Sequence, residues 1–339
     1  MRTPLCERLG IDHPIIQAPI GGPAGPALAS AVSGAGGLGT VTLTGWGADG
    51  TRRRISEVRA RTDRPFACNL LLSYDIAAEF EAMLAERVPV VSLFWGDPAP
   101  LVGRIHDSGA LLMMTVGSVA EAESAAEAGA DIIVAQGWEA GGHVRGTVST
   151  LALVPAVVDA VAPVPVAAAG GIGDGRGLAA VLALGAQAAF MGTRFLGATE
   201  AEIHPLYRTR VLAAEARDTV ISTLYDGTWP DAPGRVLRTP TVAAWEDAGR
   251  PPSGNRPGEG DIVANRPKGP IRRYDAIVAH AEFTGDIEAL PLWAGLGVGL
   301  VRREQPAADI VRDIVTEARA VLAAASRGDQ LRAPESRQP

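Results

Sequence analysis

Cysteine is scarce in this chain, which has only Cys6 and Cys68 among its 339 residues. Neither lies in a Cys-x-x-Cys or Cys/His spacing, so the sequence predicts no disulfide framework and no metal site, as in a reducing compartment. No apolar run approaches the roughly 20 residues of a membrane span, and the N-terminus lacks an apolar stretch of signal-peptide type. We therefore expect a cytoplasmic protein with no membrane partner.

Charged residues are also few, at 20% of the sequence, and the net charge is −7. Lysine and arginine form no stripe with interleaved aromatic residues, so we expect a small-molecule substrate and no nucleic acid. Hydrophobic residues make up 47% of the chain, which is enough for a large core. The length fits either two small domains or one (β/α)8 barrel with an added segment.

Short apolar runs rich in Val, Ile and Ala alternate with segments of helical period between residues 14 and 196. This alternation is typical of repeated βα units. Eight runs are expected to be strands: Ile15–Ile20, Gly37–Thr42, Phe66–Leu71, Val90–Trp95, Leu111–Val116, Asp131–Gln136, Val164–Ala169 and Ala188–Phe195. Most of them show no polar alternation, which favours an α/β fold closed as a (β/α)8 TIM barrel with both faces of the strands covered.

The intervening segments predict helices, most clearly at 118–128, where Ser118 and Glu121 resemble a capping box. After the eighth run the pattern changes to a helix expected over 198–221, followed by Gly/Pro-rich and polar stretches. We expect four parts: a barrel over 1–198, a smaller, mostly helical or loop insertion over 199–290, a segment over 291–326 whose helix completes the barrel, and a flexible tail over 327–339. Within the insertion, 250–270 is either a mobile lid or a loop held on the surface.

Glycines at the carboxyl ends of the last two strands are candidates for a phosphate site, because barrel active sites lie at these ends. The segments "AAAGGIGDG" and "FMGTRF" place Gly170, Gly171, Gly192 and Thr193 where backbone N–H groups could approach an anion. The same glycines could instead form only tight turns. A dinucleotide-binding G-x-G-x-x-G motif is excluded, because Arg176 stands where its last glycine is required, and a Walker A loop is absent.

Polar side chains at other strand ends extend this candidate site. Asn69 and Gln136 are amides on apolar strands, and a buried amide must be hydrogen-bonded, either by neighbouring backbone or by a ring cofactor. His143 follows two glycines in "AQGWEAGGHVRG". An isolated loop histidine is most simply structural, but a position after the sixth strand beside Gln136 favours a role in catalysis. Tyr225 and Trp229 either cap a substrate or only pack within the insertion.

Five segments together resemble the nitronate monooxygenase (2-nitropropane dioxygenase-like) family of FMN-dependent TIM barrels. They are "IIQAPIGG", "FACNLLL", "AQGWEAGGHVRG", "AAAGGIGDGRGLAAVLALGAQAAFMGTRF" and "LWAGLGVGLV", and the resemblance runs over nearly the whole chain. Related flavoproteins on the same scaffold, the FMN-type enoyl-acyl-carrier reductases and some NADH:quinone reductases, share much of this pattern. The resemblance therefore implies the fold and FMN more firmly than the reaction.

The resemblance also implies a role for each matching residue. The residues that would contact FMN are Ala18, Pro19 and Ile20 against the flavin, Asn69 and Gln136 at its ring, Gly141 and Gly142 nearby, and Gly170, Gly171, Gly192 and Thr193 at its phosphate. His143 would be the catalytic residue and would face the substrate. One departure concerns the family's usual AGQ-type motif, because Leu296 stands here in place of the glutamine.

The resemblance makes an FMN-dependent nitronate monooxygenase the first functional hypothesis, needing O2 but no metal. It would oxidise alkyl nitronates, and nitroalkanes if His143 removes their α-proton, to a carbonyl compound and nitrite. The alternative is an NAD(P)H-dependent FMN reductase of a quinone or an enoyl thioester. A third hypothesis, which retention of His143 and both phosphate segments disfavours, is a non-catalytic barrel that only binds a flavin or phosphate ligand. A homodimer is compatible with each of them.

Overall fold

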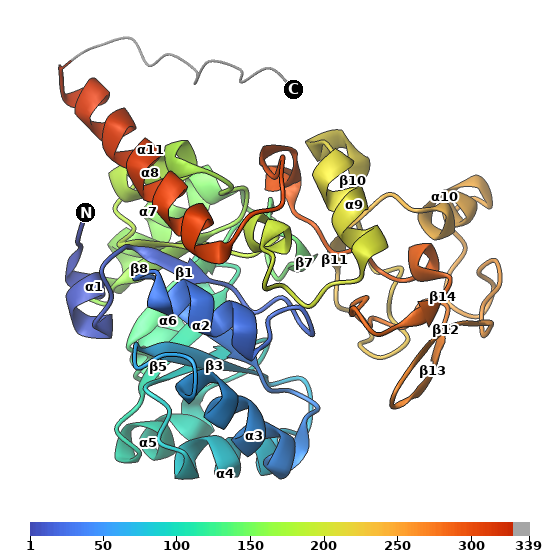
Figure 1. The fold of residues 1–339 in the computed structure, drawn as a ribbon, viewed down its shortest axis with the longest axis horizontal. Helices are drawn as coiled ribbons and strands as arrows, with labels where there is room; N and C mark the ends of the chain where they lie inside the picture. The colour runs from blue at the N-terminus through green and yellow to red at the C-terminus, as the bar shows by residue number, and fades with distance from the viewer. Residues whose placement is uncertain (328–339) are drawn as a thin grey trace.

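A computed structural model describes residues 1–327 of the chain. Eight parallel strands form the central sheet: β1 (Ile15–Gln17), β2 (Gly39–Thr42), β3 (Phe66–Leu71), β4 (Val90–Phe94), β5 (Leu111–Val116), β6 (Ile132–Gln136), β8 (Val166–Ala169) and β9 (Ala188–Met191). Their order is β1-β9-β8-β6-β5-β4-β3-β2, and a bridge between Ile16 and Leu38 links the two edges. The predicted eight-stranded TIM barrel is confirmed (Figure 1).

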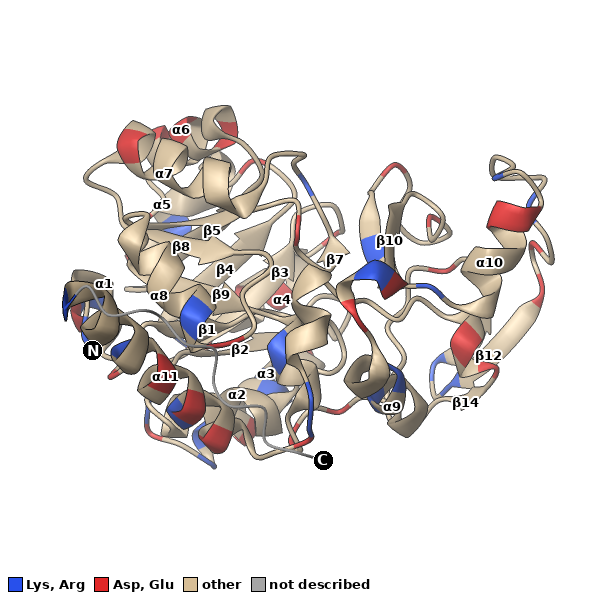
Figure 2. Cartoon of the chain, turned by 90° about the horizontal axis from the view of Figure 1, so that it is seen from above, with Lys and Arg blue, Asp and Glu red and all other residues tan. Residues whose placement is uncertain are grey.

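Helices surround this barrel on its outer face (Figure 1). They are α2 (Pro26–Gly34), α3 (Gly47–Arg59), α4 (Ala77–Ala85), α5 (Ala99–Asp107), α6 (Val119–Glu127), α7 (Thr150–Val161), α8 (Gly175–Ala183) and α11 (Ala307–Arg327). The short α1 (Pro4–Leu9) packs its apolar side chains against the inner barrel core. Charged side chains lie mainly on the helices and loops, while the barrel strands are apolar (Figure 2). Within residues 1–327, none of the helices combines the length and the apolarity that crossing a membrane requires.

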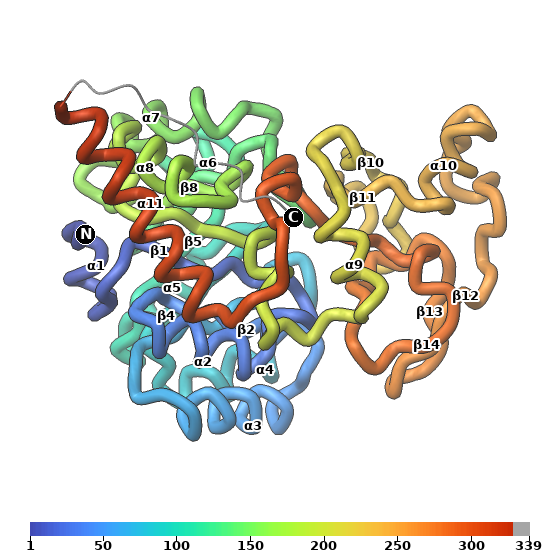
Figure 3. Tube along the Cα trace, turned by 45° about the horizontal axis from the view of Figure 1, so that its top comes forward, coloured from blue at the N-terminus to red at the C-terminus, as the bar shows by residue number. Residues whose placement is uncertain are grey.

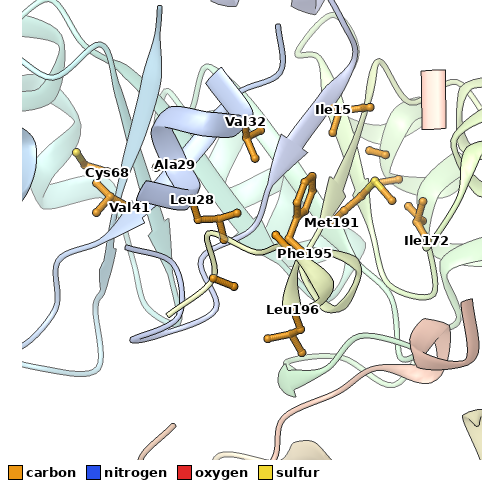
Figure 4. Packing of buried hydrophobic residues seen from close by; sticks show 14 of the residues in the cluster. Ile15, Leu28, Ala29, Val32, Val41, Cys68, Ile172, Met191, Phe195 and Leu196 are labelled. Carbon is orange, nitrogen blue, oxygen red and sulfur yellow. The ribbon is translucent and has the colours of Figure 1, made fainter. Parts of the chain in front are cut away.

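Strand alternation divides the apolar side chains into two cores. Ala67 packs inside the barrel, whereas the next residue, Cys68, belongs to the outer core between strands and helices. Figure 4 shows part of that outer core, including Cys68, Val41 and Phe195. Because residues on one strand alternate between its faces, Asn69 returns to the inner side and can reach the open end of the barrel.

The predicted barrel helices are close to the observed ones, and α6 shows its cap in detail. The Ser118 hydroxyl accepts the N–H of Glu121 at 3.2 Å, as a capping box requires. The Glu121 carboxylate, however, accepts the N–H of Gly117 at 2.8 Å and not that of Ser118. The predicted last helix is also confirmed, because α11 returns to the barrel and packs beside α8 (Figure 3). The tail expected over 327–339 lies outside the described residues from 328 onward.

The insertion differs from the expected helical or loop segment, because it contains two small antiparallel sheets beside the barrel (Figures 1 and 3). One has the order β10-β11-β7 and the other β13-β12-β14. The elements of the insertion are α9 (Pro205–Ala213), η2 (Ala216–Asp218), β10 (Thr219–Ser222), β11 (Gly234–Leu237), α10 (Pro240–Asp247), β12 (Ile262–Arg266), β13 (Gly269–Arg272), β14 (Thr284–Gly285) and η3 (Ile287–Ala289), with β7 (Gly142–His143) contributed by the barrel loop after β6. The turns η1 (Thr193–Gly197) and η4 (Leu296–Leu300) flank the insertion.

Three predicted elements are clearly wrong in length. The strand expected over Ile15–Ile20 ends at Gln17. The helix expected over 198–221 is only α9, which begins at Pro205, and the β-branched run Thr219–Ser222 pairs with β11 instead. The strand expected over Ala188–Phe195 ends at Met191, because Thr193–Gly197 forms a 3-10 turn. That residues 250–270 open and close as a lid stays a prediction. In the structure this segment continues into β12, whose last residue, Arg266, lines the barrel cavity.

Candidate active site

One cavity of about 480 Å³ opens at the carboxyl ends of the barrel strands. This volume falls within the range of about 300–1,000 Å³ that is usual for small-molecule and cofactor sites. All twelve residues proposed from the sequence line it: Ala18, Pro19, Ile20, Asn69, Gln136, Gly141, Gly142, His143, Gly170, Gly171, Gly192 and Thr193. The structure therefore brings the whole predicted set together from five strand ends and the loop after β6.

The wall formed after β8 and β9 is built from backbone. Gly170 and Gly171 have φ values of +108° and +71°, a left-handed conformation that glycine adopts without strain. A Cβ atom at Gly170 would lie 2.7 Å from the Thr150 hydroxyl, so a larger residue would not fit. Thr193 begins the neighbouring 3-10 turn, and its hydroxyl accepts the N–H of Gly295 at 2.9 Å. A wall made of backbone without bulky side chains fits a phosphate group, because backbone N–H groups can approach the phosphate oxygens closely there.

Two polar groups on the opposite part of the wall lack partners. Asn69 donates its amide N–H to the carbonyl of Ser92 at 3.1 Å, but its own side-chain oxygen receives no donor within residues 1–327. Thr42, the register partner of Asn69 on β2, has a buried hydroxyl that is also unpaired in this part of the chain. Because unpaired buried polar groups cost free energy, this corner fits a heterocyclic ring that carries both donors and acceptors.

Gln136 lies on the cavity wall but binds the protein backbone with both ends of its amide. Its Nε2 donates to the carbonyl of His143 at 3.0 Å, and its Oε1 accepts the N–H of Arg145 at 3.1 Å. Only one amide N–H then remains for a ligand. The contacts therefore show Gln136 holding the loop that carries His143, in addition to any contact with a cofactor ring.

The insertion holds the same loop from the other side. His143 and Gly142 pair with Gly234 and Arg235 of β11. The Arg235 side chain is only 5% exposed, and it donates to the carbonyl oxygens of Trp138 and Ala140 at 2.9 and 3.2 Å. These contacts fix the loop between the barrel and the insertion.

Close packing explains why position 141 of this loop is a glycine. A Cβ atom at Gly141 would lie 2.3 Å from the backbone nitrogen of Gly295. Leu296, the residue that replaces the expected glutamine, donates its N–H to the carbonyl of Glu139 at 2.9 Å. Its neighbours Gly295 and Gly297 belong to the cavity wall. The replacement therefore removes a polar side chain but keeps the backbone that closes the cavity.

His143 is held in one tautomer. Its Nδ1 lies 3.2 Å from the carbonyl oxygen of Ala232, and because a carbonyl only accepts, Nδ1 carries the hydrogen. Nε2 then carries the lone pair, and within residues 1–327 no N–H or O–H group donates to it. Burial lowers the pKa of His143 to about 4, from an ordinary value near 6.5, so the imidazole is neutral at pH 7.

Aromatic side chains that sequence reasoning did not assign surround the imidazole. Its ring centre lies 4.1 Å from that of Trp229 and 4.8 Å from that of Trp293, and both tryptophans line the cavity. Tyr225, which had been considered together with Trp229, lies in a separate small core with Tyr274. Trp229 therefore belongs to the site and Tyr225 serves packing. Trp293 stands in the segment "LWAGLGVGLV" that carries part of the resemblance, but its place against His143 follows only from the fold.

The TIM barrel carries at its carboxyl end a cavity with a glycine-built backbone wall, unpaired polar groups and a buried neutral histidine, an arrangement that fits a flavin-dependent oxidoreductase. The comparisons with known proteins agree. The family model described as nitronate monooxygenase matches residues 2–86 and 76–317. The chain belongs to the nitronate monooxygenase family.

Individual relatives differ in their activities. The chain is 36% identical to a nitronate monooxygenase of Pseudomonas aeruginosa, over 92% of this chain and 97% of that protein. It is 40% identical to the (3aS,4S,5R,7aS)-5-hydroxy-7a-methyl-1-oxo-octahydro-1H-indene-4-carboxyl-CoA dehydrogenase of Mycobacterium tuberculosis, over 74% of this chain and 70% of that protein. The solved structure of FabK from Thermotoga maritima is 33% identical and matches with a TM-score of 0.80, covering 97% of this chain and 99% of that one.

Proposed function

We propose that this protein binds FMN in the barrel cavity and oxidises alkyl nitronates with O2 to a carbonyl compound and nitrite. The observation that carries the proposal is the neutral His143, with Nδ1 fixed by Ala232 and Nε2 free, on the wall of a cavity that fits a flavin in a member of this family. Atom balance for this oxidation requires one O2 for every two nitronates.

The chain's own residues would hold the cofactor in two places. Gly170, Gly171, Gly192 and Thr193 would bind the phosphate through backbone N–H groups and the Thr193 hydroxyl. Asn69 would donate to or accept from the ring edge, together with the unpaired Thr42 hydroxyl. FMN supplies the redox chemistry, by accepting electrons from the substrate and passing them on to O2.

His143 sets a preference between two forms of the substrate. Removing the α-proton of a neutral nitroalkane requires Nε2 to act as a base, and general-base catalysis is most efficient when the pKa of the base lies near the working pH. A pKa of about 4 makes His143 a weak base. A nitronate has already lost that proton, so we expect nitronates to react much faster than the corresponding nitroalkanes.

The test uses the purified, FMN-loaded protein without oxygen. Propionate nitronate, NADH and NADPH are mixed with it separately while the flavin absorbance is followed. Bleaching with the nitronate and not with the nicotinamides supports the proposal, and nitrite should then form when air is admitted. Rapid bleaching with NADH or NADPH alone would refute it, and a protein that takes up no FMN would be a non-catalytic barrel.

A second candidate is a flavin enzyme that acts on a thioester or a quinone with NAD(P)H as the reductant. The observation that favours it is the 40% identity to a mycobacterial CoA-ester dehydrogenase over 74% of this chain. The same anaerobic experiment separates the two candidates.

A further inference from the structure

A second cavity, of about 560 Å³, lies beside the active-site cavity at the ends of β4 and β5. The two cavities share one lining residue, Thr115 of β5. Asp97 and Ser124 on the wall of the second cavity are exposed, so water can enter it. Because a water molecule takes about 30 Å³ in the liquid, a cavity of this size holds several of them. The residues that separate the two cavities therefore decide whether this water reaches His143, which lines the first.

Trp95 stands between the two cavities. It follows the last residue of β4 and lines the second cavity, whereas its chain neighbour Phe94 lines the first. The centre of its ring lies 5.9 Å from that of His143, with an angle of 72° between the ring planes, and 5.1 Å from that of Trp229. The indole of Trp95 therefore fills the space between the imidazole and the second cavity.

The backbone of Trp95 has an unusual conformation. Its φ is +65°, in the left-handed region, which makes a residue with so bulky a side chain an outlier. This conformation costs free energy at a residue other than glycine, so the surrounding contacts must maintain it. Strained residues of this kind concentrate at functional sites, and here the strained residue touches the proposed catalytic histidine.

Arg145 holds the indole from the side of the second cavity, which it lines. Its guanidinium carbon lies 5.1 Å from the centre of the Trp95 ring, as in a cation–π contact. The same guanidinium donates through Nε to the Glu121 carboxylate at 2.7 Å, and the backbone N–H of Arg145 donates to Gln136 at 3.1 Å. Arg145 thus connects the indole to the glutamine that also holds the His143 loop.

Charged groups do not account for the state of the imidazole. Burial lowers the pKa of His143 and outweighs its backbone hydrogen bonds at Ala232 and Pro233, which act in the opposite direction. The charged residues on its own loop and on the elements packed around it are Asp97, Glu139, Arg145, Asp226, Asp231 and Arg235.

Each of these six residues is either exposed or bound to another group. Asp97 and Asp231 are exposed. The other four are bound, Glu139 by Thr150, Arg145 by Glu121, Asp226 by Arg256, and Arg235 by the carbonyls of Trp138 and Ala140. The exclusion of water, and not a neighbouring charge, therefore maintains the neutral imidazole.

We propose that Trp95 is a positioning residue that keeps water away from the imidazole of His143 by closing it off from the second cavity. Trp229 and Trp293 cover the same ring from the insertion and from the returning chain, and Trp95 covers it from the barrel. This inference goes beyond the proposed function, because it concerns the histidine and needs neither FMN nor a nitronate. Only its consequence for catalysis rests on that function.

The experiment measures the protonation of His143 directly. The imidazole NMR signals of the purified protein are followed from acid to neutral pH, with and without FMN, and His143→Gln identifies the signal of His143. Trp95→Gly removes the indole and suits the left-handed backbone. We expect it to raise the pKa of His143 from about 4 to above about 5.5, because water then solvates the protonated ring. Trp95→Phe keeps an aromatic ring and should leave this pKa near 4.

Trp245→Ala is the matched control. It removes a tryptophan of the insertion whose Nε1 donates to the carbonyl of Pro251, and it should leave the pKa of His143 near 4. The proposal is wrong if folded Trp95→Gly keeps a pKa near 4, or if Trp95→Phe raises it as far as Trp95→Gly does. Should Trp95→Gly not fold, Trp95→Asn replaces it with the same expectation, because asparagine also tolerates the left-handed region and is small and polar.

Catalysis gives a second readout. A stronger base favours removal of an α-proton, so Trp95→Gly should raise the ratio of kcat/KM for a neutral nitroalkane to that for its nitronate about fivefold. Failure of the two proposals can be told apart. A raised pKa in Trp95→Gly without nitrite formation by the unmodified protein would remove the oxidation and leave the role of Trp95. Normal nitrite formation with an unchanged pKa in Trp95→Gly would remove the role of Trp95 alone.

Discussion

Replacing Gln136 with leucine tests whether this amide holds the catalytic loop or binds the cofactor ring. Leucine has nearly the same volume but can neither donate to the His143 carbonyl nor accept from the Arg145 N–H. Two hydrogen bonds of about 1 kcal/mol each are lost, which is about 2 kcal/mol or a factor of about 30 in the ordering of the loop. We expect kcat/KM for a nitronate to fall between about fivefold and thirtyfold.

The affinity for FMN separates the two roles. If Gln136 acts through the loop, the FMN dissociation constant, measured by fluorescence titration, should change less than about threefold while kcat/KM falls. Gln187→Leu is the control, because Gln187 accepts the N–H of Leu5 at the opposite end of the barrel. This control removes one side-chain hydrogen bond, so it should lose about 1 kcal/mol of stability in a urea titration and keep its activity. The reasoning is refuted if Gln136→Leu binds FMN tenfold or more weakly and the loaded enzyme keeps full activity.

Four further outcomes follow from the same structure. His143→Ala should lower kcat/KM for a neutral nitroalkane by about 100- to 10,000-fold, measured as nitrite release. In the unmodified enzyme this activity should fall as the pH drops through about 4, because the neutral imidazole becomes protonated there. A midpoint near pH 6.5 would contradict the burial of His143. Arg235→Met should lower the free energy of unfolding in urea by about 1–3 kcal/mol, since two buried carbonyl oxygens lose their donor, and an unchanged midpoint would contradict this. Cys6 and Cys68 are fully buried, and burial raises the pKa of the Cys68 thiol, so a thiol reagent should label neither in the native protein and both in denaturant.

The barrel could be predicted because its strands carry a strong local signal. Parallel strands covered on both faces appear as continuous apolar runs, and glycine-rich turns mark their ends. The same rule that places active sites at these ends selected residues that the structure brings together, from Ala18 on β1 to Thr193 after β9. The strand boundaries were less predictable, because the last apolar residues, such as Phe195, pack equally well in a 3-10 turn.

The insertion could not be predicted in the same way. Its strands are five residues or shorter, and β7 has only two, too few to show alternation. Their pairing depends on partners far along the chain, as in the contact between His143 and Gly234. For the same reason nothing local in the sequence indicates that Arg266 lines the cavity, since it arrives there only through the fold of the insertion.

The insertion therefore forms part of the proposed active site. The barrel places His143 at the end of β6, but the carbonyl that determines which ring nitrogen carries the hydrogen belongs to Ala232 of the insertion. Trp229, which buries the imidazole and so contributes to its low pKa, comes from the same segment. A barrel without residues 199–290 would keep the glycine wall for a phosphate but would leave His143 exposed, free to change tautomer and protonated near pH 6.5. In this protein the proposed cofactor site is thus built by the barrel, whereas the tautomer and the pKa of the histidine depend on the insertion packed against it.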